Sequence, residues 1–162
     1  TVVQTLRVLQ QQFDVAISDD QMKDGLLHTV ANTGLLGRWQ QLGTRPKIIC
    51  DTAHNKDGLF VVMQQLERQV FEKLHFVFGV VSDKDLSQIL PLLPKNAIYY
   101  FCKPNMPRGL DADLLCEKAK EFGLFGNVYS SVRTAYESAR KQAGTDDLIY
   151  VGGSTFVVAE IV

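Results

Sequence analysis

The spacing of hydrophobic residues changes near residue 37 of the chain. Before that point apolar residues recur at helical spacing, first in "TVVQTLRVLQQQF" and then in "SDDQMKDGLLHTV". We therefore predict two helices within residues 1–36, the second with Ser18 or Asp19 as its N-cap. The glycines of "NTGLLG" are expected to end this second helix.

Beyond residue 37, short apolar runs alternate with amphipathic helical patterns. Strands are predicted in "RWQQLG", "KIICD", "HFVFGVV", "AIYYFC", "NVYSS" and "DLIYVGG". Helices are predicted at residues 55–71, at 82–93 with a Ser82 or Asp83 cap, and at 111–123, 132–144 and 154–162. The inner strands are nearly all apolar, as strands covered on both faces must be. The chain is thus expected to be α/β, with an open, mostly parallel twisted sheet and helices on both faces.

Composition narrows the class of protein without identifying it. A length of 162 residues suits a domain with a sizeable core, and a net charge of −1 gives no general attraction to nucleic acid or an anionic membrane. We find no signal peptide and no apolar run near the roughly 18 residues of a membrane helix. The three cysteines are far apart in apolar stretches, which predicts buried free thiols in a reducing cytoplasm and no metal site.

Polar side chains gather at the predicted strand ends. Asp51 ends one buried strand and His54 and Asn55 follow it in "CDTAHN", while Ser154 follows the last strand in "GGSTF". Other strand ends carry Ser82, Asp83, Lys103 and Arg108. Open α/β sheets bind ligands outside the carboxyl ends of their strands. We therefore expect the functional site at this edge of the sheet.

Most of these polar residues have a structural and a functional interpretation. Asp51 suits a turn or cap, or an acceptor for the hydroxyl groups of a ligand such as ribose. His54 suits a hydrogen-bonded histidine in a turn, or a residue that orients substrate beside the helix start at Asn55. Ser154 suits an N-cap, or a hydroxyl that faces a carboxylate or phosphate.

The charged residues also have both a structural and a functional interpretation. Arg38 and Arg108 suit surface arginines or phosphate clamps, and "VSDKDL" suits a capped helix start with solvated charges. His28, inside a predicted helix, and His75, at a strand start, are interpreted as structural. The sequence has no G-x-x-x-x-G-K-[ST], G-x-G-x-x-G or G-x-S-x-G motif, so it does not hold a complete nucleotide site of a known phosphate-loop kind.

Five segments, in order, resemble the motifs of one family. "GRWQQL", "IICDTAHNKDGL", "VFGVVSDKD", "PNMPRGLDADLL" and "VGGSTFVVAE" resemble the C-terminal domain of folylpolyglutamate synthases, including the bifunctional dihydrofolate synthases, in the Mur ligase superfamily. The resemblance covers residues 37–162 and implies a Rossmann-like glutamate-ligase domain. Residues 1–36 resemble the last helices of an upstream ATPase domain or a linker. Because the chain opens at Thr1 within a helix, we expect a fragment of a longer protein.

The resemblance implies a reaction in which ATP activates a carboxylate as an acyl phosphate and L-glutamate attacks it. Arg38 would then reach the ATP phosphates, and Asp51 would hold the ribose hydroxyls. His54 and Ser154 would line the glutamate pocket, with His54 as the catalytic residue near the attacking amine. Asn55 would support the turn that carries His54.

The resemblance also implies what this chain lacks. The phosphate loop and the Mg²⁺ ligands are expected in the upstream domain, so the chain alone is expected to be inactive. Lys84 and Asp85 match a D-K-D motif without an assigned role, and Lys56 replaces a frequent proline. Folate or dihydropteroate as substrate rests on the resemblance alone. The alternatives are a peptidoglycan or cyanophycin ligase domain, or a stand-alone module that binds a nucleotide or amino acid.

Overall fold

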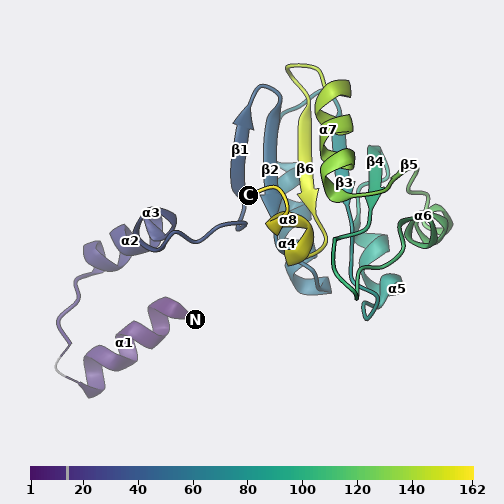
Figure 1. Cartoon of the computed structure of the whole chain (residues 1–162). Coiled ribbons are helices and arrows are strands. Elements are labelled where there is room, and N and C mark those ends of the chain that lie inside the picture. The colour runs from purple at the N-terminus through teal and green to yellow at the C-terminus, as the bar shows by residue number, and fades with distance from the viewer. Residues whose placement is uncertain (14) are drawn as a thin grey trace. The chain divides into compact units, whose positions relative to one another are not determined.

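The computed structural model describes residues 1–13 and 15–162, which divide into two compact units, residues 1–36 and 37–162 (Figure 1). The described part of the first unit contains helices α1 (Val2–Gln12), α2 (Asp19–Leu27) and α3 (Thr29–Thr33). The predicted Ser18 cap is confirmed, because its hydroxyl accepts the Gln21 N–H at 3.1 Å. The prediction of a single helix through His28 was wrong. The Thr29 hydroxyl bonds to the carbonyl oxygens of the preceding turn, and His28 separates α2 from α3.

The second unit is built on one sheet with the strand order β1-β2-β6-β3-β4-β5. The strands are β1 (Gln40–Thr44), β2 (Lys47–Asp51), β3 (Leu74–Phe78), β4 (Ala97–Cys102), β5 (Gly126–Tyr129) and β6 (Leu148–Gly152). β1 pairs with β2 antiparallel, and the other neighbours pair parallel. This confirms the predicted open, mostly parallel sheet.

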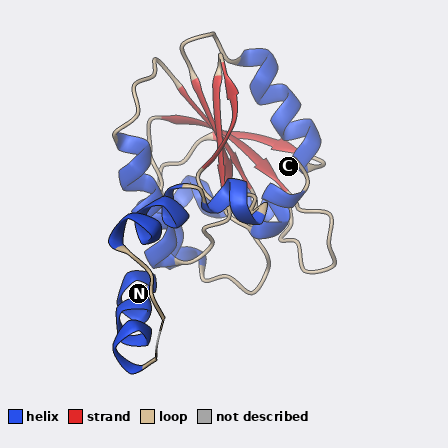
Figure 2. Ribbon diagram, turned by 90° about the vertical axis from the view of Figure 1, so that its left-hand side faces the viewer, coloured by secondary structure: helices blue, strands red, loops and turns tan. Residues whose placement is uncertain are grey.

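Helices cover both faces of the sheet, as predicted (Figure 2). They are α4 (Lys56–Glu67), α5 (Leu86–Ile89), the short 3₁₀ helix η1 (Leu90–Leu92), α6 (Ala112–Glu121), α7 (Val132–Gln142) and α8 (Thr155–Ala159). Alternate residues of each strand face opposite sides. Phe76 and Phe78 of β3 therefore pack with α4, α5 and α6, whereas Val77 packs with α7 and α8.

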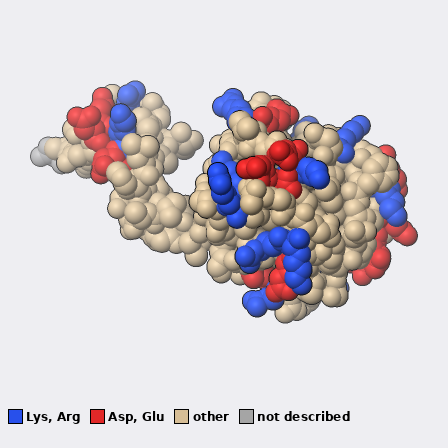
Figure 3. Space-filling model, turned by 90° about the horizontal axis from the view of Figure 1, so that it is seen from above, with Lys and Arg blue, Asp and Glu red and all other residues tan. Residues whose placement is uncertain are grey.

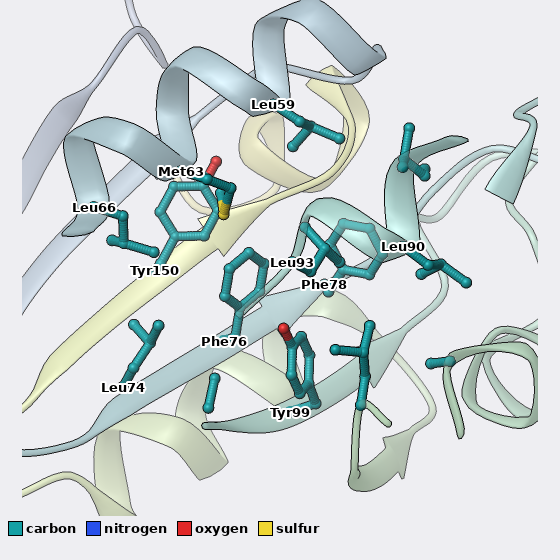
Figure 4. Close-up of a cluster of buried hydrophobic side chains, with 14 of the residues drawn as sticks. Leu59, Met63, Leu66, Leu74, Phe76, Phe78, Leu90, Leu93, Tyr99 and Tyr150 are labelled. Carbon is teal, nitrogen blue, oxygen red and sulfur yellow. The ribbon is translucent and has the colours of Figure 1, made fainter. Parts of the chain in front are cut away.

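Aromatic rings form the centre of the core beneath α4 (Figure 4). The Phe76 ring centroid lies 4.7 Å from that of Tyr150 and 5.2 Å from that of Tyr99. Leu59 and Met63 of α4 cover these rings (Figure 4). Each fully buried side chain of this size stabilises the fold by about 1.5–3 kcal/mol, so the three strands that carry the rings are held firmly together.

Two predicted helices differ from the structure. The helix predicted at 55–71 ends at Glu67, where a tight turn forms as the Gln69 N–H donates to the Leu66 carbonyl oxygen, and Val70 is 97% exposed. The segment predicted as one helix at 82–93 is α5 followed by η1, and Pro91 lacks the N–H that a longer helix requires. Its cap is Asp85, not Ser82 or Asp83. Hydrogen bonds from Ser87 and Gln88 hold the pKa of Asp85 below its usual value.

The surface and the cysteines agree with the composition. On the face seen in Figure 3, Lys and Arg side chains are interspersed with Asp and Glu, so that face has no extended basic area of the kind that binds nucleic acid. No helix in residues 1–13 and 15–162 has the length and apolarity needed to span a bilayer. Cys50, Cys102 and Cys116 are buried free thiols, as predicted, and burial beside Asp51 raises the pKa of Cys50 to about 11.

A buried polar network joins β3, β4 and the start of β6. The Nε2–H of His75 donates to Asp147 Oδ2 at 3.1 Å, and its Nδ1 lies 2.8 Å from the Tyr100 hydroxyl. Asp147 also accepts the N–H groups of Lys73 at 3.0 Å and Gly144 at 2.7 Å. Burial raises the pKa of Asp147, but hydrogen bonds from Gly144, His75 and Lys73 outweigh it and leave the pKa below its ordinary value. This location fits the interpretation of His75 as structural.

Replacing Asp147 with Asn should destabilise the chain, because an amide cannot accept all three N–H groups. We expect a loss of about 1.5–3 kcal/mol at pH 7, the contribution of a hydrogen bond to a charged group. The folded-state pKa of Asp147 is lowered, so its stabilisation is present above its unfolded-state pKa and is lost as pH falls through the lowered value. Urea unfolding between pH 7 and pH 3 should therefore show a flatter acid dependence in D147N. Equal losses in D147N and in D146N, a change at the exposed neighbour, would contradict this assignment.

Candidate functional site

Four neighbouring strands end at one level of the sheet. Asp51 of β2 pairs with Gly152 of β6, Gly152 with Phe78 of β3, and Phe78 with Phe101 of β4. These ends lie where the β6 arrow points in Figure 1. The loops that follow the four strands therefore begin side by side, although they are far apart in the sequence.

A cavity of about 190 Å³ lies among these loops. Its polar lining residues are His54 after β2, Ser154 and Thr155 after β6, Asp83 and Lys84 after β3, and Arg108 after β4. Val81 and Phe156 complete the lining. His54 and Ser154, predicted to share a pocket, do lie together in the structure.

The His54 ring is oriented by its own turn. Its Nδ1 lies 2.9 Å from the carbonyl oxygen of Thr52, which accepts the Nδ1–H. In the neutral ring this contact leaves Nε2 without a proton and therefore able to accept one. Asn55 holds the same turn from the other side, because its Oδ1 accepts the Gly58 N–H at 2.8 Å and caps α4.

Ser154 is fixed by the sharp turn between β6 and α8. It is 3% exposed, and its hydroxyl oxygen accepts the Phe156 N–H at 3.2 Å as the N-cap of α8. The preceding Gly153 has a φ of +95°, and a Cβ there would lie 2.5 Å from the Phe78 ring and 2.7 Å from the Gly79 carbonyl oxygen. Glycine is therefore required at 153 for Ser154 to reach the cavity.

Lys84 and Arg108 reach the cavity because their loops pair with each other. Val81 and Gly109 form an antiparallel bridge, and the Ser82 N–H donates to the Arg108 carbonyl oxygen at 2.8 Å. The Arg108 guanidinium lies 3.3 Å from Asp83 Oδ2 and 5.9 Å from the centre of the Phe156 ring. Both charged groups are exposed, so the ion pair stabilises the fold by at most about 1 kcal/mol. Lys84 and Arg108 follow different strands, and this bridge brings their side chains to one cavity.

Arg38 and Asp51, the predicted nucleotide ligands, do not line the cavity. Arg38 is exposed in the turn before β1. Asp51 is 6% exposed, and its two carboxylate oxygens accept the N–H groups of Trp39 at 2.6 Å and Ala53 at 2.7 Å. Trp39 has a φ of +43°, a left-handed conformation that costs roughly 1–2 kcal/mol in a non-glycine residue and is held by this contact.

The described residues do not fit a metal site. Within residues 1–13 and 15–162, no three His, Cys, Asp or Glu side chains gather as a group that could hold a metal ion. Asp83, the acidic residue of the cavity lining, pairs with Arg108, and Asp51, outside the lining, accepts two backbone N–H groups. We therefore assign no chemical step to a metal on this chain.

Comparison with known proteins places this geometry in a family. Residues 37–155 match the family model described as Mur ligase, glutamate ligase domain. The chain belongs to the Mur ligase family. This Mur ligase domain is similar to a probable bifunctional folylpolyglutamate synthase/dihydropteroate synthase of Haloferax volcanii, with 34% identity over 125 residues. The alignment covers 76% of this chain and 15% of that protein.

Solved structures agree with this assignment. The Mur ligase domain is similar to E. coli FolC in complex with DHPP and ADP, with a TM-score of 0.78 and 28% identity. It is also similar to a bifunctional folylpolyglutamate synthase/dihydrofolate synthase with Mn, AMPPNP and L-glutamate bound, with a TM-score of 0.77 and 29% identity. Each match covers 91% of this chain and 34% of that structure, so the chain spans about a third of their length. The resemblance stated from the five motifs is confirmed.

Replacing Gly153 with Ala should destabilise the chain more than replacing Gly123. Both glycines have left-handed backbones, with φ of +95° and +76°, but a Cβ at 123 meets only the Lys95 side chain at 3.8 Å. We expect G123A to cost about 1 kcal/mol for the backbone conformation alone and G153A about 1–3 kcal/mol more, because it overpacks the β6–β3 contact. Chemical denaturation of both variants measures the difference. Equal losses would show that the close approach to Phe78 and Gly79 is unimportant.

Proposed function

We propose that this Mur ligase domain forms the amino-acid side of an ATP-dependent ligase that adds L-glutamate to a folate or to dihydropteroate. The convergence of His54, Ser154, Lys84 and Arg108 on one cavity carries this proposal. The names of the relatives favour a folyl substrate over a peptidoglycan or cyanophycin precursor. A cytoplasmic location, expected from the cysteines, stays a prediction.

The cavity suits an amino acid with more than one carboxylate. Lys84 and Arg108 bring two cations to its lining, against one carboxylate, Asp83, which pairs with Arg108. A guanidinium can bind a carboxylate through two parallel hydrogen bonds. The Ser154 hydroxyl accepts the Phe156 N–H and keeps its own O–H as a donor for a ligand oxygen. These donors would hold glutamate so that its amino group faces His54.

His54 is the residue best placed to take a proton from the attacking amine. In the proposed reaction the substrate carboxylate first takes the γ-phosphoryl group of ATP. The glutamate nitrogen then attacks the acyl carbon, the C–O bond to phosphate breaks, and an amide forms. The nitrogen must also lose a proton, for which Nε2 of His54 is the acceptor, because Nδ1–H is held by the Thr52 carbonyl oxygen.

The ATP side of the reaction needs a second domain. We propose that Arg38 reaches the ATP phosphates, while an upstream ATPase domain of the same protein supplies the phosphate loop and the Mg²⁺ ligands. The unit of residues 1–36 supports this proposal, because several of its apolar side chains are exposed, including Phe13 at 60% and Leu27 at 71%. We interpret this unit as the tail of that domain or as a linker to it.

Removing the His54 or Ser154 side chain from the full-length protein should weaken glutamate use far more than ATP use. Each lost hydrogen bond to a charged group is worth roughly 1.5–3 kcal/mol, or about 10- to 150-fold in transition-state affinity. We expect H54A to lower kcat mainly and S154A to raise the KM for glutamate mainly. Steady-state kinetics with each substrate varied in turn would measure both effects.

A matched control separates substrate binding from helix capping. Ser131 caps α7 as Ser154 caps α8, but it does not line the cavity. S131A should therefore share the capping loss of S154A and keep normal glutamate kinetics. A loss confined to the ATP constant, with glutamate use intact in H54A and S154A, would overturn the proposed pocket.

The chain of 162 residues should not ligate glutamate by itself, because its sequence has no phosphate loop. Its affinity for ATP should be no tighter than about millimolar, the level of a few exposed contacts. Isothermal titration with ATP, and incubation with ATP, Mg²⁺, a folate and labelled glutamate, would measure both properties. Ligation well above background, or a micromolar dissociation constant for ATP, would contradict the proposal that a second domain is needed for the ATP side of the reaction.

A further inference from the structure

We propose that Glu160 is a positioning residue that keeps Arg108 at the cavity lined by His54 and Ser154. The inference rests on the proposed function, in which Arg108 binds a carboxylate of glutamate. Glu160 directly follows α8 and does not line that cavity itself. It acts through the Arg108 loop, residues 103–109, which follows β4.

The Arg108 loop is folded into one compact turn. The Met106 N–H donates to the Pro104 carbonyl oxygen at 2.8 Å, and the Gly109 N–H donates to the Met106 carbonyl oxygen at 2.9 Å. Pro104 and Pro107 each have a fixed φ. A Cβ at Gly109 would lie 2.5 Å from the Pro104 carbonyl oxygen, so the two ends of the loop lie close together. A displacement of the first half of the loop therefore moves Arg108 as well.

Hydrogen bonds attach this loop to elements on either side of it. Toward β3, the Arg108 carbonyl oxygen accepts the Ser82 N–H at 2.8 Å. At the tip of the loop, the Asn105 N–H donates to Oε1 of Glu160 at 2.7 Å, a length typical of a hydrogen bond to an ionised acceptor. The first contact holds the backbone of Arg108 near the cavity, and the second fixes the path by which the loop leaves β4.

Open space lies beside the loop on the side of β5. A second cavity, of about 510 Å³, is lined there by residues 103–107, by Ser130 and Ser131 after β5, and by Glu160. The cavity lined by His54 and Ser154 lies on the other side of the loop, toward β3 and β6. Without the contact to Glu160, the loop has room to move into the second cavity. That movement would carry the Arg108 side chain away from the first one.

The short helix α8 gives Glu160 a firm base. With five residues it is too short to be stable by itself, but Val157 and Val158 fix it in the core at 0% and 1% exposure. The centre of its Phe156 ring lies 5.9 Å from the Arg108 guanidinium, within the range of a cation–π contact. Helix α8 therefore holds the Arg108 loop at two points, the side chain through Phe156 and the tip through Glu160.

Replacing Glu160 with Ala in the full-length protein should raise the KM for glutamate about 3- to 10-fold, because the loop loses one hydrogen bond to a charged group. The kcat and the KM for ATP should stay within about 2-fold, because His54 and the nucleotide side are unchanged. E160Q should restore most of the affinity, because an amide oxygen also accepts the Asn105 N–H. E117A removes the same charge from the exposed face of α6 and should leave every constant unchanged.

A double variant tests whether Glu160 acts through Arg108. In an R108A background, E160A should change the KM for glutamate by less than about 2-fold, because the residue that Glu160 positions is gone. Steady-state kinetics of the two single variants and the double variant measure this coupling. A loss of the same size in both backgrounds would overturn the proposal, and so would an unchanged KM for glutamate in E160A.

NMR of the chain of 162 residues tests the position of Arg108 without catalysis. The Phe156 ring should shift the Arg108 side-chain resonances upfield, and E160A should move them toward those of a free arginine. F156L, which removes the ring, sets the scale of this shift. Random-coil Arg108 resonances in the unsubstituted chain, or unchanged ones in a folded E160A variant, would overturn the positioning role. If the unsubstituted full-length protein does not join glutamate at all, the proposed function fails, while these resonances still decide whether Glu160 positions Arg108.

Discussion

The parallel pairing of β2, β6 and β3 is the constraint on which the rest of the structure depends. It sets Asp51, Gly152 and Phe78 at one level, so the loops that follow begin together. A slip of two residues would move one loop by about 6.6 Å along its strand, and a slip of one would turn its side chains to the other face. The register cannot slip easily, because both faces are buried and the rings of Phe76, Tyr99 and Tyr150 interlock across three strands.

The close packing below the site limits which residues can occupy the strand ends. Gly153 lies against the Phe78 ring, and a Cβ at Gly152 would lie 2.6 Å from the Tyr150 hydroxyl. That hydroxyl is a buried polar atom with no hydrogen-bond partner among the described residues, which costs about 1–3 kcal/mol relative to a paired group. Glycines bring the two strands and the tyrosine into contact, and the turn to Ser154 is correspondingly sharp.

The sequence was sufficient to predict the fold and to predict that His54 and Ser154 lie at one edge of the sheet. Strands covered on both faces have a strong apolar signal, and Asp51, His54 and Ser154 follow them directly, so their common edge was predictable. The ends of the helices were harder to predict. The end of α4 at Glu67 and the cap at Asp85 depend on local hydrogen bonds that neighbouring residues could equally have made. The convergence of Lys84 and Arg108 needed the bridge between Val81 and Gly109, and the contact of Asp51 with Trp39 spans 12 positions. Neither pairing leaves a periodic signal.

Three polar side chains of the site share one feature, which is a hydrogen bond to the backbone of a neighbouring residue. His54 donates to the Thr52 carbonyl oxygen, Ser154 accepts the Phe156 N–H, and Asn55 accepts the Gly58 N–H. These backbone contacts fix the side chains of His54 and Ser154. Nε2 of His54 and the O–H of Ser154 are not used in them and can bind a ligand. In the proposed reaction, little side-chain entropy would then be lost when glutamate binds to these two residues, which favours precise alignment of the attacking amine. Lys84 and Arg108 differ, because no hydrogen bond links the Lys84 side chain to another described side chain, and the Arg108 guanidinium contacts only the exposed Asp83 and the Phe156 ring among the described residues. In the proposed reaction, the backbone contacts of His54 and Ser154 would therefore set the geometry of the site, and the side chains of Lys84 and Arg108 would supply charge.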